Sequence, residues 1–113
     1  MSSEQRDVER LPILGELHGE LMVYQPMLIK EIGIGGATVE TGYPLQLNSL
    51  HDVRLTLAST AVIVKGRVVH SRISDVDQDI VTYSTDLEFV EPSQRVVTVI
   101  EEYLRFVRAV RQG

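Results

Sequence analysis

Apolar and polar residues alternate along most of this chain, and the period of the alternation changes once, near the C-terminus. Six segments show the two-residue alternation or the β-branched runs that are typical of strands. Short stretches rich in glycine, proline and polar residues separate them, as expected for turns. The six expected strands cover residues 16–24, 27–32, 37–41, 52–57, 61–73 and 80–90.

The strand expected at 52–57 alternates most clearly. Its residues Val53, Leu55 and Leu57 would point into a core, and the polar residues between them would point outward. The sequence SDVDQD at 74–79 is strongly polar, so we expect it to form a turn between the last two strands. It lacks the glycine and the closing glutamate of a calcium-binding loop.

From Pro92 onward the apolar residues recur with the spacing of an α-helix. We expect a helix over about residues 92–111, with Ser93 as its N-terminal cap and one apolar stripe against the strands. The same stripe is compatible with a seam between two copies of the chain, which would give a homo-oligomer through the C-terminal helix. The stripe consists of Val96, Ile100, Tyr103, Val107 and Val110.

This order of elements predicts a mainly β fold, a six-stranded antiparallel barrel with a C-terminal α-helix. A chain of 113 residues is long enough for one core but too short for two. Residues 1–12 are mostly polar and charged, so we expect a flexible N-terminal arm there. Residues 13–113 would form the single barrel domain with its helix.

Composition excludes several classes of protein. The chain has no cysteine, so it has no disulfide framework, no thiolate metal site and no cysteine nucleophile. Its net charge of −5 argues against nucleic acid as a partner, because binding to a phosphate backbone needs a basic face. Neither a signal peptide nor a run of about 20 apolar residues is present, so we expect a cytoplasmic protein that does not insert into membranes.

No set of residues with catalytic spacing stands out. The three histidines, His18, His51 and His70, lie far apart on different expected elements, so we expect no metal site. The G-x-S-x-G motif of hydrolases is absent, and no pair of carboxylates has a recognisable acid–base arrangement. The sequence therefore predicts a protein that is not an enzyme.

The most unusual stretch is KEIGIGGATVET at residues 30–41, which holds Gly33, Gly35 and Gly36. A dinucleotide-binding fingerprint would need a third glycine where Thr38 stands, followed by a helix instead of a strand. A P-loop would need G-K-[ST] after the glycines. Two interpretations remain open, namely a tight turn between strands with glycines at positive φ, and the remains of a ligand site.

Two short motifs occur in a suggestive order. RDVER places Arg6 and Arg10 just before the first expected strand, and EIGIGG follows about twenty residues later. The order of an Arg-x-x-x-Arg arm, this turn, a GRVVHS strand, a strand ending in LEF and a final helix resembles the PilZ domain family. Members of that family are bacterial six-stranded barrels that commonly bind cyclic dimeric GMP (c-di-GMP).

The resemblance implies which residues would bind that ligand. The arginine motif is met by Arg6 and Arg10. The second motif, [Asp/Asn]-x-Ser-x-x-Gly, falls on EIGIGG, with Glu31 at the acidic position, Gly33 in place of the serine and Gly36 matching. Arginine forks pair with phosphate or with guanine, a carboxylate accepts from the guanine edge, and glycine allows close approach. The two departures would weaken binding about 30- to 150-fold.

Two functions of different classes follow. In the first, the chain is a PilZ-like receptor or adaptor that binds c-di-GMP as a ligand, possesses no cofactor, and signals through a protein partner. In the second, it is a ligand-independent PilZ-fold module for protein–protein interaction. Arg6 and Arg10 would then be a solvated pair in the arm, since such a pair is frequent by chance in an arginine-rich chain.

Overall fold

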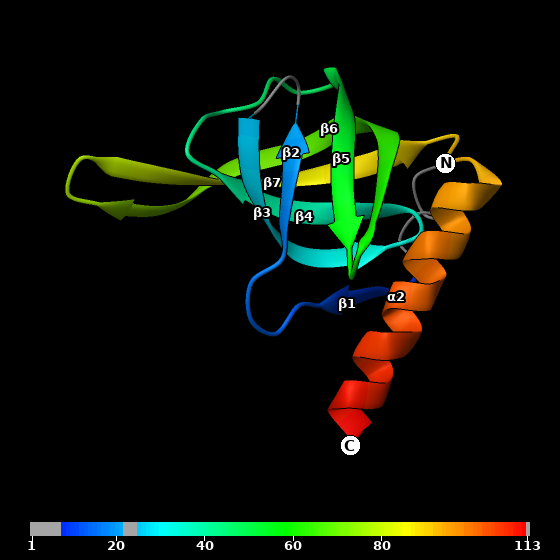
Figure 1. The fold of residues 1–113 in the computed structure, drawn as a ribbon. Helices are drawn as coiled ribbons and strands as arrows, with labels where there is room; N and C mark the ends of the chain where they lie inside the picture. The colour runs from blue at the N-terminus through cyan, green and yellow to red at the C-terminus, as the bar shows by residue number, and fades with distance from the viewer. Residues whose placement is uncertain (1–7, 22–24, 113) are drawn as a thin grey trace.

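A computed structural model describes residues 8–21 and 25–112 of the chain (Figure 1). In this part of the chain all the paired strands are antiparallel, and one helix follows them. The elements are β1 (Arg10–Pro12), β2 (His18–Leu21), β3 (Gln25–Gly33), β4 (Gly36–Thr41), β5 (Leu50–Leu57), β6 (Thr60–Asp77), β7 (Ile80–Val90) and α2 (Gln94–Gln112).

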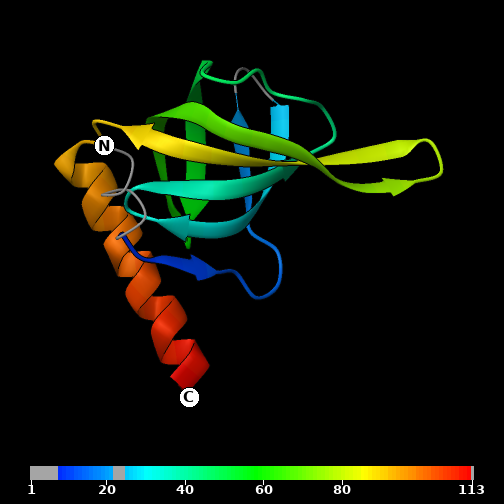
Figure 2. The ribbon, with the colours of Figure 1, turned by 180° about the vertical axis from the view of Figure 1, so that it is seen from behind.

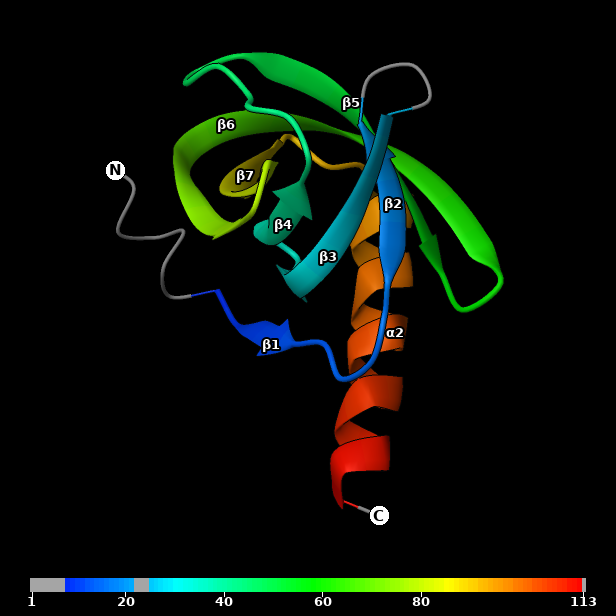
Figure 3. The same ribbon diagram turned by 90° about the vertical axis from the view of Figure 1, so that its left-hand side faces the viewer.

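Six of the strands form a closed ring, so the expected six-stranded arrangement is confirmed. Strand β2 pairs with β3 and β5, β3 pairs with β4, β4 with β7, β7 with β6, and β6 with β5. Figure 3 views the ring from one end. Within the ring each of the six strands has a paired neighbour on both edges, which removes a common cause of aggregation.

Strand β1 lies outside the ring and was not expected from the sequence. It pairs with residues 31–33 of β3 and places Leu11, only 8% exposed, beside the buried Ile32. Residues 10–12 therefore belong to the sheet, although the sequence pattern placed them in the arm. The backbone continues along the same edge of β3, because the Ile13 amide donates to the Lys30 carbonyl at 2.8 Å.

The core fills the inside of the ring with aliphatic side chains from alternate strand positions. The expected alternation in β5 is confirmed, with Val53 and Leu55 fully buried and Leu57 nearly so. The other buried hydrophobic side chains of the strands are Leu11, Met27, Ile29, Ile32, Ala37, Val39, Val62, Val64, Val68, Leu87 and Phe89.

Helix α2 packs against strands β3, β5 and β6 and covers one side of the ring (Figures 1 and 2). The expected cap is confirmed, since the amide of Val96 donates to the Ser93 hydroxyl at 3.2 Å. Ile100 is fully buried, and the buried Leu104 was missing from the predicted stripe. Val110 was wrongly included, because the helix extends past the ring and leaves this side chain 59% exposed. No helix among the described residues is long and apolar enough to cross a bilayer.

Strands β6 and β7 form a long hairpin that projects from the ring (Figures 1 and 2). The polar stretch at 74–79 was expected to be a turn, but β6 continues through Asp77 and only residues 78 and 79 turn. The segment continues the hairpin despite its charge, because Asp75, Val76 and Asp77 pair with residues 82, 81 and 80 of β7 after a bulge that follows Ile73.

The burial pattern of the helix generates a stability prediction. Replacing Ile100 by alanine should lower the free energy of unfolding by about 2–5 kcal/mol, because a fully buried side chain leaves a cavity. The matched control, Val110→Ala on the exposed part of the same helix, should change it by less than about 0.5 kcal/mol. Urea unfolding of both variants measures this, and equal losses would contradict the packing of α2 on the ring.

Candidate ligand-binding site

The glycine-rich stretch forms a tight hairpin between β3 and β4. Gly33 pairs with Gly36, and residues 34 and 35 make the turn, so we call residues 33–36 the glycine hairpin. The interpretation as a turn is thus confirmed, but its expected reason is not. Neither Gly33 nor Gly36 has a positive φ, so the backbone conformation does not require glycine at these two positions.

Close packing explains the two glycines instead. A Cβ atom on Gly33 would overlap the carbonyl oxygen of Glu9 and lie 2.9 Å from its carbonyl carbon. A Cβ atom on Gly36 would overlap the carbonyl oxygen of Leu87 and lie 2.7 Å from Nη2 of Arg10. Gly33 and Gly36 therefore carry no side chain because the segment before β1 and the neighbouring strand β7 both lie directly against them.

Arg10 lies across the glycine hairpin. It is the pairing partner of Gly33 in the sheet, and its side chain extends past Gly33 to bring the guanidinium beside Gly36. The structure thus brings together three of the five residues predicted to bind ligand. Arg6, the other predicted arginine, lies outside the described residues.

Glu31, the fifth predicted residue, lies on the same outer face as Arg10. A bulge between Ile29 and Glu31 keeps Ile32 in the core and turns the half-buried Glu31 outward. Glu31 pairs with Pro12 of β1, two positions from Arg10, so the two side chains start about 7 Å apart along the strand. Glu31 thus stands two residues before the glycine hairpin, on the same outer face as Arg10.

Two rows of polar residues extend this face across β7 and β6, and the sequence pattern did not reveal them. In the first row, Gly36 pairs with Glu88, and Glu88 pairs with Arg67. Nη1 of Arg67 donates to Oε1 of Glu88 at 3.3 Å. The row thus runs from Arg10 through the glycine hairpin and Glu88 to Arg67, with a guanidinium at each end.

The second row begins at Glu31, which pairs with Thr38 of β4. The hydroxyl of Thr38 donates to Oδ1 of Asp86 at 2.6 Å, and Nδ1 of His70 lies 3.7 Å from Oδ2 of the same carboxylate. The sequence signal for both rows is the pair of polar residues, Asp86 and Glu88, that flank the inward-facing Leu87 on β7. Which polar residues face one another depends on strand register, which the sequence alone does not give.

The Thr38 hydroxyl of the second row donates its hydrogen bond to the carboxylate of Asp86. Among residues 8–21 and 25–112, no group of three His, Asp or Glu side chains is placed to hold a metal ion. What the face offers is a set of guanidinium donors and carboxylate acceptors around Gly33 and Gly36.

The segment that carries Arg10 also touches helix α2. Nη2 of Arg108 donates to Oε1 of Glu9, and Nη2 of Arg111 donates to the carbonyl of Pro12. Strand β3 holds this segment on one side and the end of α2 holds it on the other. A change in the position of Arg10 would therefore alter the contacts that Arg108 and Arg111, in the C-terminal turns of the helix, make with this segment.

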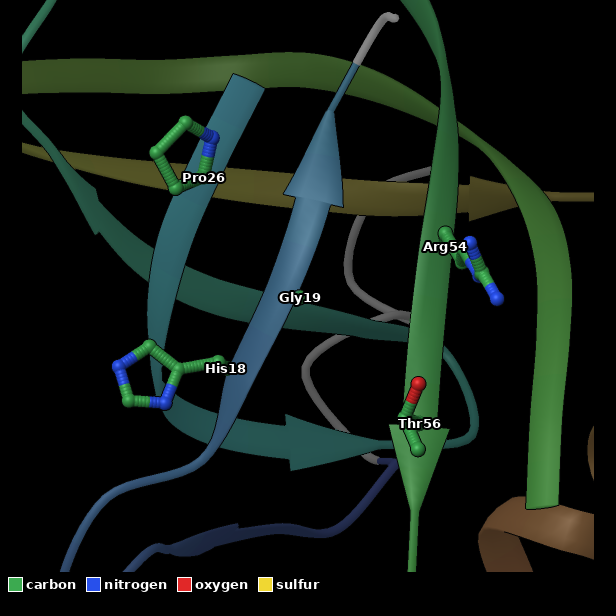
Figure 4. A pocket seen from close by; sticks show the side chains of 5 residues that line it. All are labelled: His18, Gly19, Pro26, Arg54 and Thr56. Atoms are coloured by element: carbon green, nitrogen blue, oxygen red, sulfur yellow. The ribbon is translucent and has the colours of Figure 1, made fainter. Parts of the chain in front are cut away.

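A second hollow lies over β2 and β5, lined by His18, Gly19, Pro26, Arg54 and Thr56 (Figure 4). It contains none of the predicted ligand residues. His18 of the hollow pairs with Leu28, five residues before Gly33 on β3, so about 17 Å of strand separates this hollow from the glycine hairpin. The two sites are therefore distinct.

Comparison with solved structures identifies the fold. The chain superposes on MrkH of K. pneumonia in its apo state with a TM-score of 0.77 and 20% identity, covering 93% of this chain and 53% of MrkH. The PilZ domain of YcgR from Escherichia coli, solved with c-di-GMP, matches with a TM-score of 0.72 and 13% identity over 94% of this chain and 96% of that domain. The Bacillus subtilis inhibitor of motility MotI/DgrA matches with a TM-score of 0.72 and 16% identity, covering 96% of this chain and 52% of that protein.

These likenesses show that the chain has a PilZ fold, as its motifs indicated. The chain spans about half the length of the MrkH protein it resembles. No protein-family model and no curated protein sequence matches the chain.

The packing of the glycine hairpin generates a second prediction. Gly33→Ser, which introduces the serine of the PilZ motif, should displace residues 9 and 10, because the new Cβ overlaps the Glu9 carbonyl. We expect a loss of about 1–3 kcal/mol in the free energy of unfolding and faster amide exchange in β1.

The control for this prediction is Gly42→Ser. A Cβ atom there would meet nothing within 4 Å, so stability should change by less than about 0.5 kcal/mol. Hydrogen exchange read by mass spectrometry reports both quantities. Unchanged exchange at residues 9–12 in Gly33→Ser would show that close packing is not the reason for the glycine.

Proposed function

We propose that this PilZ-fold chain is a cytoplasmic, non-enzymatic receptor that binds c-di-GMP weakly and signals through a protein partner. The ligand would bind at Arg6, Arg10, Glu31, Gly33 and Gly36. The observation that carries the proposal is the position of Arg10, whose guanidinium lies across the glycine hairpin although the two are far apart in sequence. The two sequence motifs thus meet on one face.

The chemistry of the face supports a ligand with guanine bases and phosphates. A guanidinium can pair with guanine O6 and N7 or with a phosphate, and its flat side can stack on a base. Glu31 supplies a carboxylate that can accept from the guanine N1–H and N2–H groups. Gly33 and Gly36 have no side chain that would keep a planar ring away from the backbone.

The solved relatives support the choice of ligand. YcgR and MrkH have the same fold, and structures of both were solved in complex with c-di-GMP. Since their identity with this chain is low, the transfer of the ligand depends on the geometry of Arg10 and the glycine hairpin.

Weak binding follows from two features of the site. Gly33 offers no hydroxyl, and Glu31 is one methylene longer than the aspartate of the motif, which together correspond to about 30- to 150-fold in affinity. The carbonyl of Glu9 also occupies the space over Gly33 where a serine side chain would stand. A ligand hydroxyl or amine has one contact fewer at this position.

A second candidate function is a ligand-independent interaction module. The observation in its favour is that Glu9 and Arg10 are held against the glycine hairpin by the pairing of β1 with β3 and by the contact of Arg108 with Glu9. In that case the arm would be a structural part of the fold. Direct titration separates the two functions.

The proposal predicts saturable binding of c-di-GMP that depends on Arg10. Isothermal titration of the full chain should give binding to c-di-GMP and much weaker binding to GTP and cyclic GMP. Arg10→Ala should lower the affinity about 10- to 100-fold, because a hydrogen bond between charged groups is lost. Arg6→Ala should act in the same direction.

Arg105→Ala is the matched control, since Arg105 is exposed on helix α2 and belongs to neither motif. It should leave the affinity unchanged. No heat of binding at millimolar c-di-GMP, or equal losses in the Arg10 and Arg105 variants, would contradict the receptor function and favour the interaction module.

A further inference from the structure

The C-terminal part of helix α2 extends past the ring and has little of the ring to pack against (Figures 1 and 2). Beyond the buried Leu104, the described side chains of the helix are half-buried or exposed. Val107 still packs partly against the core, but Val110 is 59% exposed. A helix end with so few buried apolar contacts opens easily, so these turns need another source of order.

Strand β1 is weakly held for a different reason. It has three residues, and among the described strands it pairs only with β3. Leu11 is its one buried side chain. So short a strand gains little from pairing, because ordering each of its residues costs backbone entropy. Yet this strand carries Arg10, whose guanidinium lies beside Gly36.

Two arginines of α2 join these two weakly held elements. The side chain of Arg108 contacts Glu9, and the side chain of Arg111 contacts the carbonyl of Pro12. The two arginines are three positions apart, so they lie on one side of the helix. We call these two contacts the clasp. Because Glu9 and Pro12 stand on either side of Arg10 in the sequence, the clasp holds the chain both before and after it.

The contact with Pro12 follows from the direction of the backbone. The amide of Ile13 donates to the carbonyl of Lys30 on β3 at 2.8 Å. In a trans peptide unit the N–H and the C=O point in opposite directions, so the Pro12 carbonyl faces away from β3. Arg111 therefore supplies the hydrogen-bond donor that this edge of β1 would otherwise take from water.

The contact with Glu9 acts on the position of Arg10. The Arg108 and Glu9 side chains are 41% and 53% exposed, so their attraction is modest and is weakened by salt. The backbone carbonyl of Glu9 lies directly against Gly33, the pairing partner of Arg10. A hold on Glu9 therefore fixes the backbone from which the Arg10 side chain starts.

The clasp has a closed and an open state. When it is closed, Arg10 is fixed beside Gly36 and the last turns of α2 are anchored to β1. When it opens, β1 loses the contacts on its outer edge and the last turns of the helix lose their anchor. A ligand that contacts Arg10 binds the closed state better and so increases its population.

We propose that Arg108 and Arg111 are positioning residues for Arg10, and that the clasp couples the proposed ligand face to the C-terminal turns of α2. The inference rests on the proposed function, because it names how a ligand bound at Arg10 would be communicated. Coupling between two sites is reciprocal. Binding of c-di-GMP steadies the C-terminal turns, and a loosened helix end weakens the binding of c-di-GMP.

The first test needs no ligand. Amide hydrogen exchange of the full chain is followed by NMR at Leu11 and Ile13 and at residues 107–111. The double variant Arg108→Ala with Arg111→Ala should raise exchange about three- to tenfold at Leu11 and Ile13, because two weak contacts are lost. Alanine is the best helix former, so faster exchange at 107–111 would report the lost clasp and not a lost helix propensity.

The effect should also pass in the opposite direction. Glu9→Ala should speed exchange at residues 107–111, although these residues are distant in sequence. Adding Glu9→Ala to Arg108→Ala should speed it no further, since either change alone breaks the contact. Arg105→Ala is the control, because Arg105 is exposed on the same helix and has no hydrogen bond or ion pair with β1 within residues 8–21 and 25–112.

The second test measures c-di-GMP affinity by isothermal titration. The double variant should bind about three- to tenfold more weakly. Arg105→Ala removes a charge from the same helix and should bind like the unaltered chain, which separates positioning from general attraction of an anion. In an Arg10→Ala background the double variant should cause no further loss, because Arg108 and Arg111 act through Arg10.

Two further readouts distinguish positioning from a merely structural role. Saturating c-di-GMP should slow exchange at residues 107–111 in the unaltered chain and leave it unchanged in the double variant. Arg111→Lys keeps a donor for the Pro12 carbonyl, so it should retain more of the c-di-GMP affinity than Arg111→Ala does.

The inference is overturned if the double variant leaves exchange at Leu11 and Ile13 unchanged, or if Arg105→Ala raises it equally. Binding of c-di-GMP to the double variant as tightly as to the unaltered chain would overturn it too. Coupled exchange in a chain that binds no c-di-GMP would support the clasp and contradict only the proposed ligand, so the two failures are distinguishable.

Discussion

Pairing of β4 along both of its edges is the constraint on which the rest of the structure depends. The strand has only six residues, yet it joins β3 to β7 and so closes the ring. Its Ala37 and Val39 are completely buried. Because a two-residue turn links it to β3, the glycine hairpin must lie where β1, β3, β4 and β7 come together. The place of the glycine hairpin and of Arg10 beside it is therefore a consequence of ring closure.

Close packing at that junction explains the two glycines. The backbone of Glu9 approaches Gly33, and Arg10 and β7 approach Gly36, so a side chain at either position would separate the strands. The guanidinium of Arg10 therefore lies beside a position without a side chain. Because close packing accounts for glycine at these two positions, a glycine here does not by itself distinguish the receptor from the interaction module.

Periodicity predicted the six ring strands and the helix, because each has enough residues to show its repeat. It missed β1, in which Leu11 is the single buried side chain, and it treated residues 74–79 as a turn because Val76 is their only apolar residue. The contact between Arg10 and the glycine hairpin comes from the structure, and the role of these residues in binding stays a prediction. The polar rows that pass through Asp86 and Glu88 were beyond reach, since bulges in β3 and β6 set the register and a shift of one residue changes every pairing.

The outer part of the β6–β7 hairpin, which projects from the ring, also determines how proteins of this architecture can diverge. Residues 74–82 bond only to one another, so lengthening or shortening the two strands there leaves every hydrogen bond of the ring in place. Because side chains alternate with a period of two, insertions of two residues per strand preserve which side is apolar, whereas a single insertion reverses it. Evolution can therefore change the reach of this projection in even steps and acquire new partners while the ring, and whatever it binds at the glycine hairpin, is inherited unchanged.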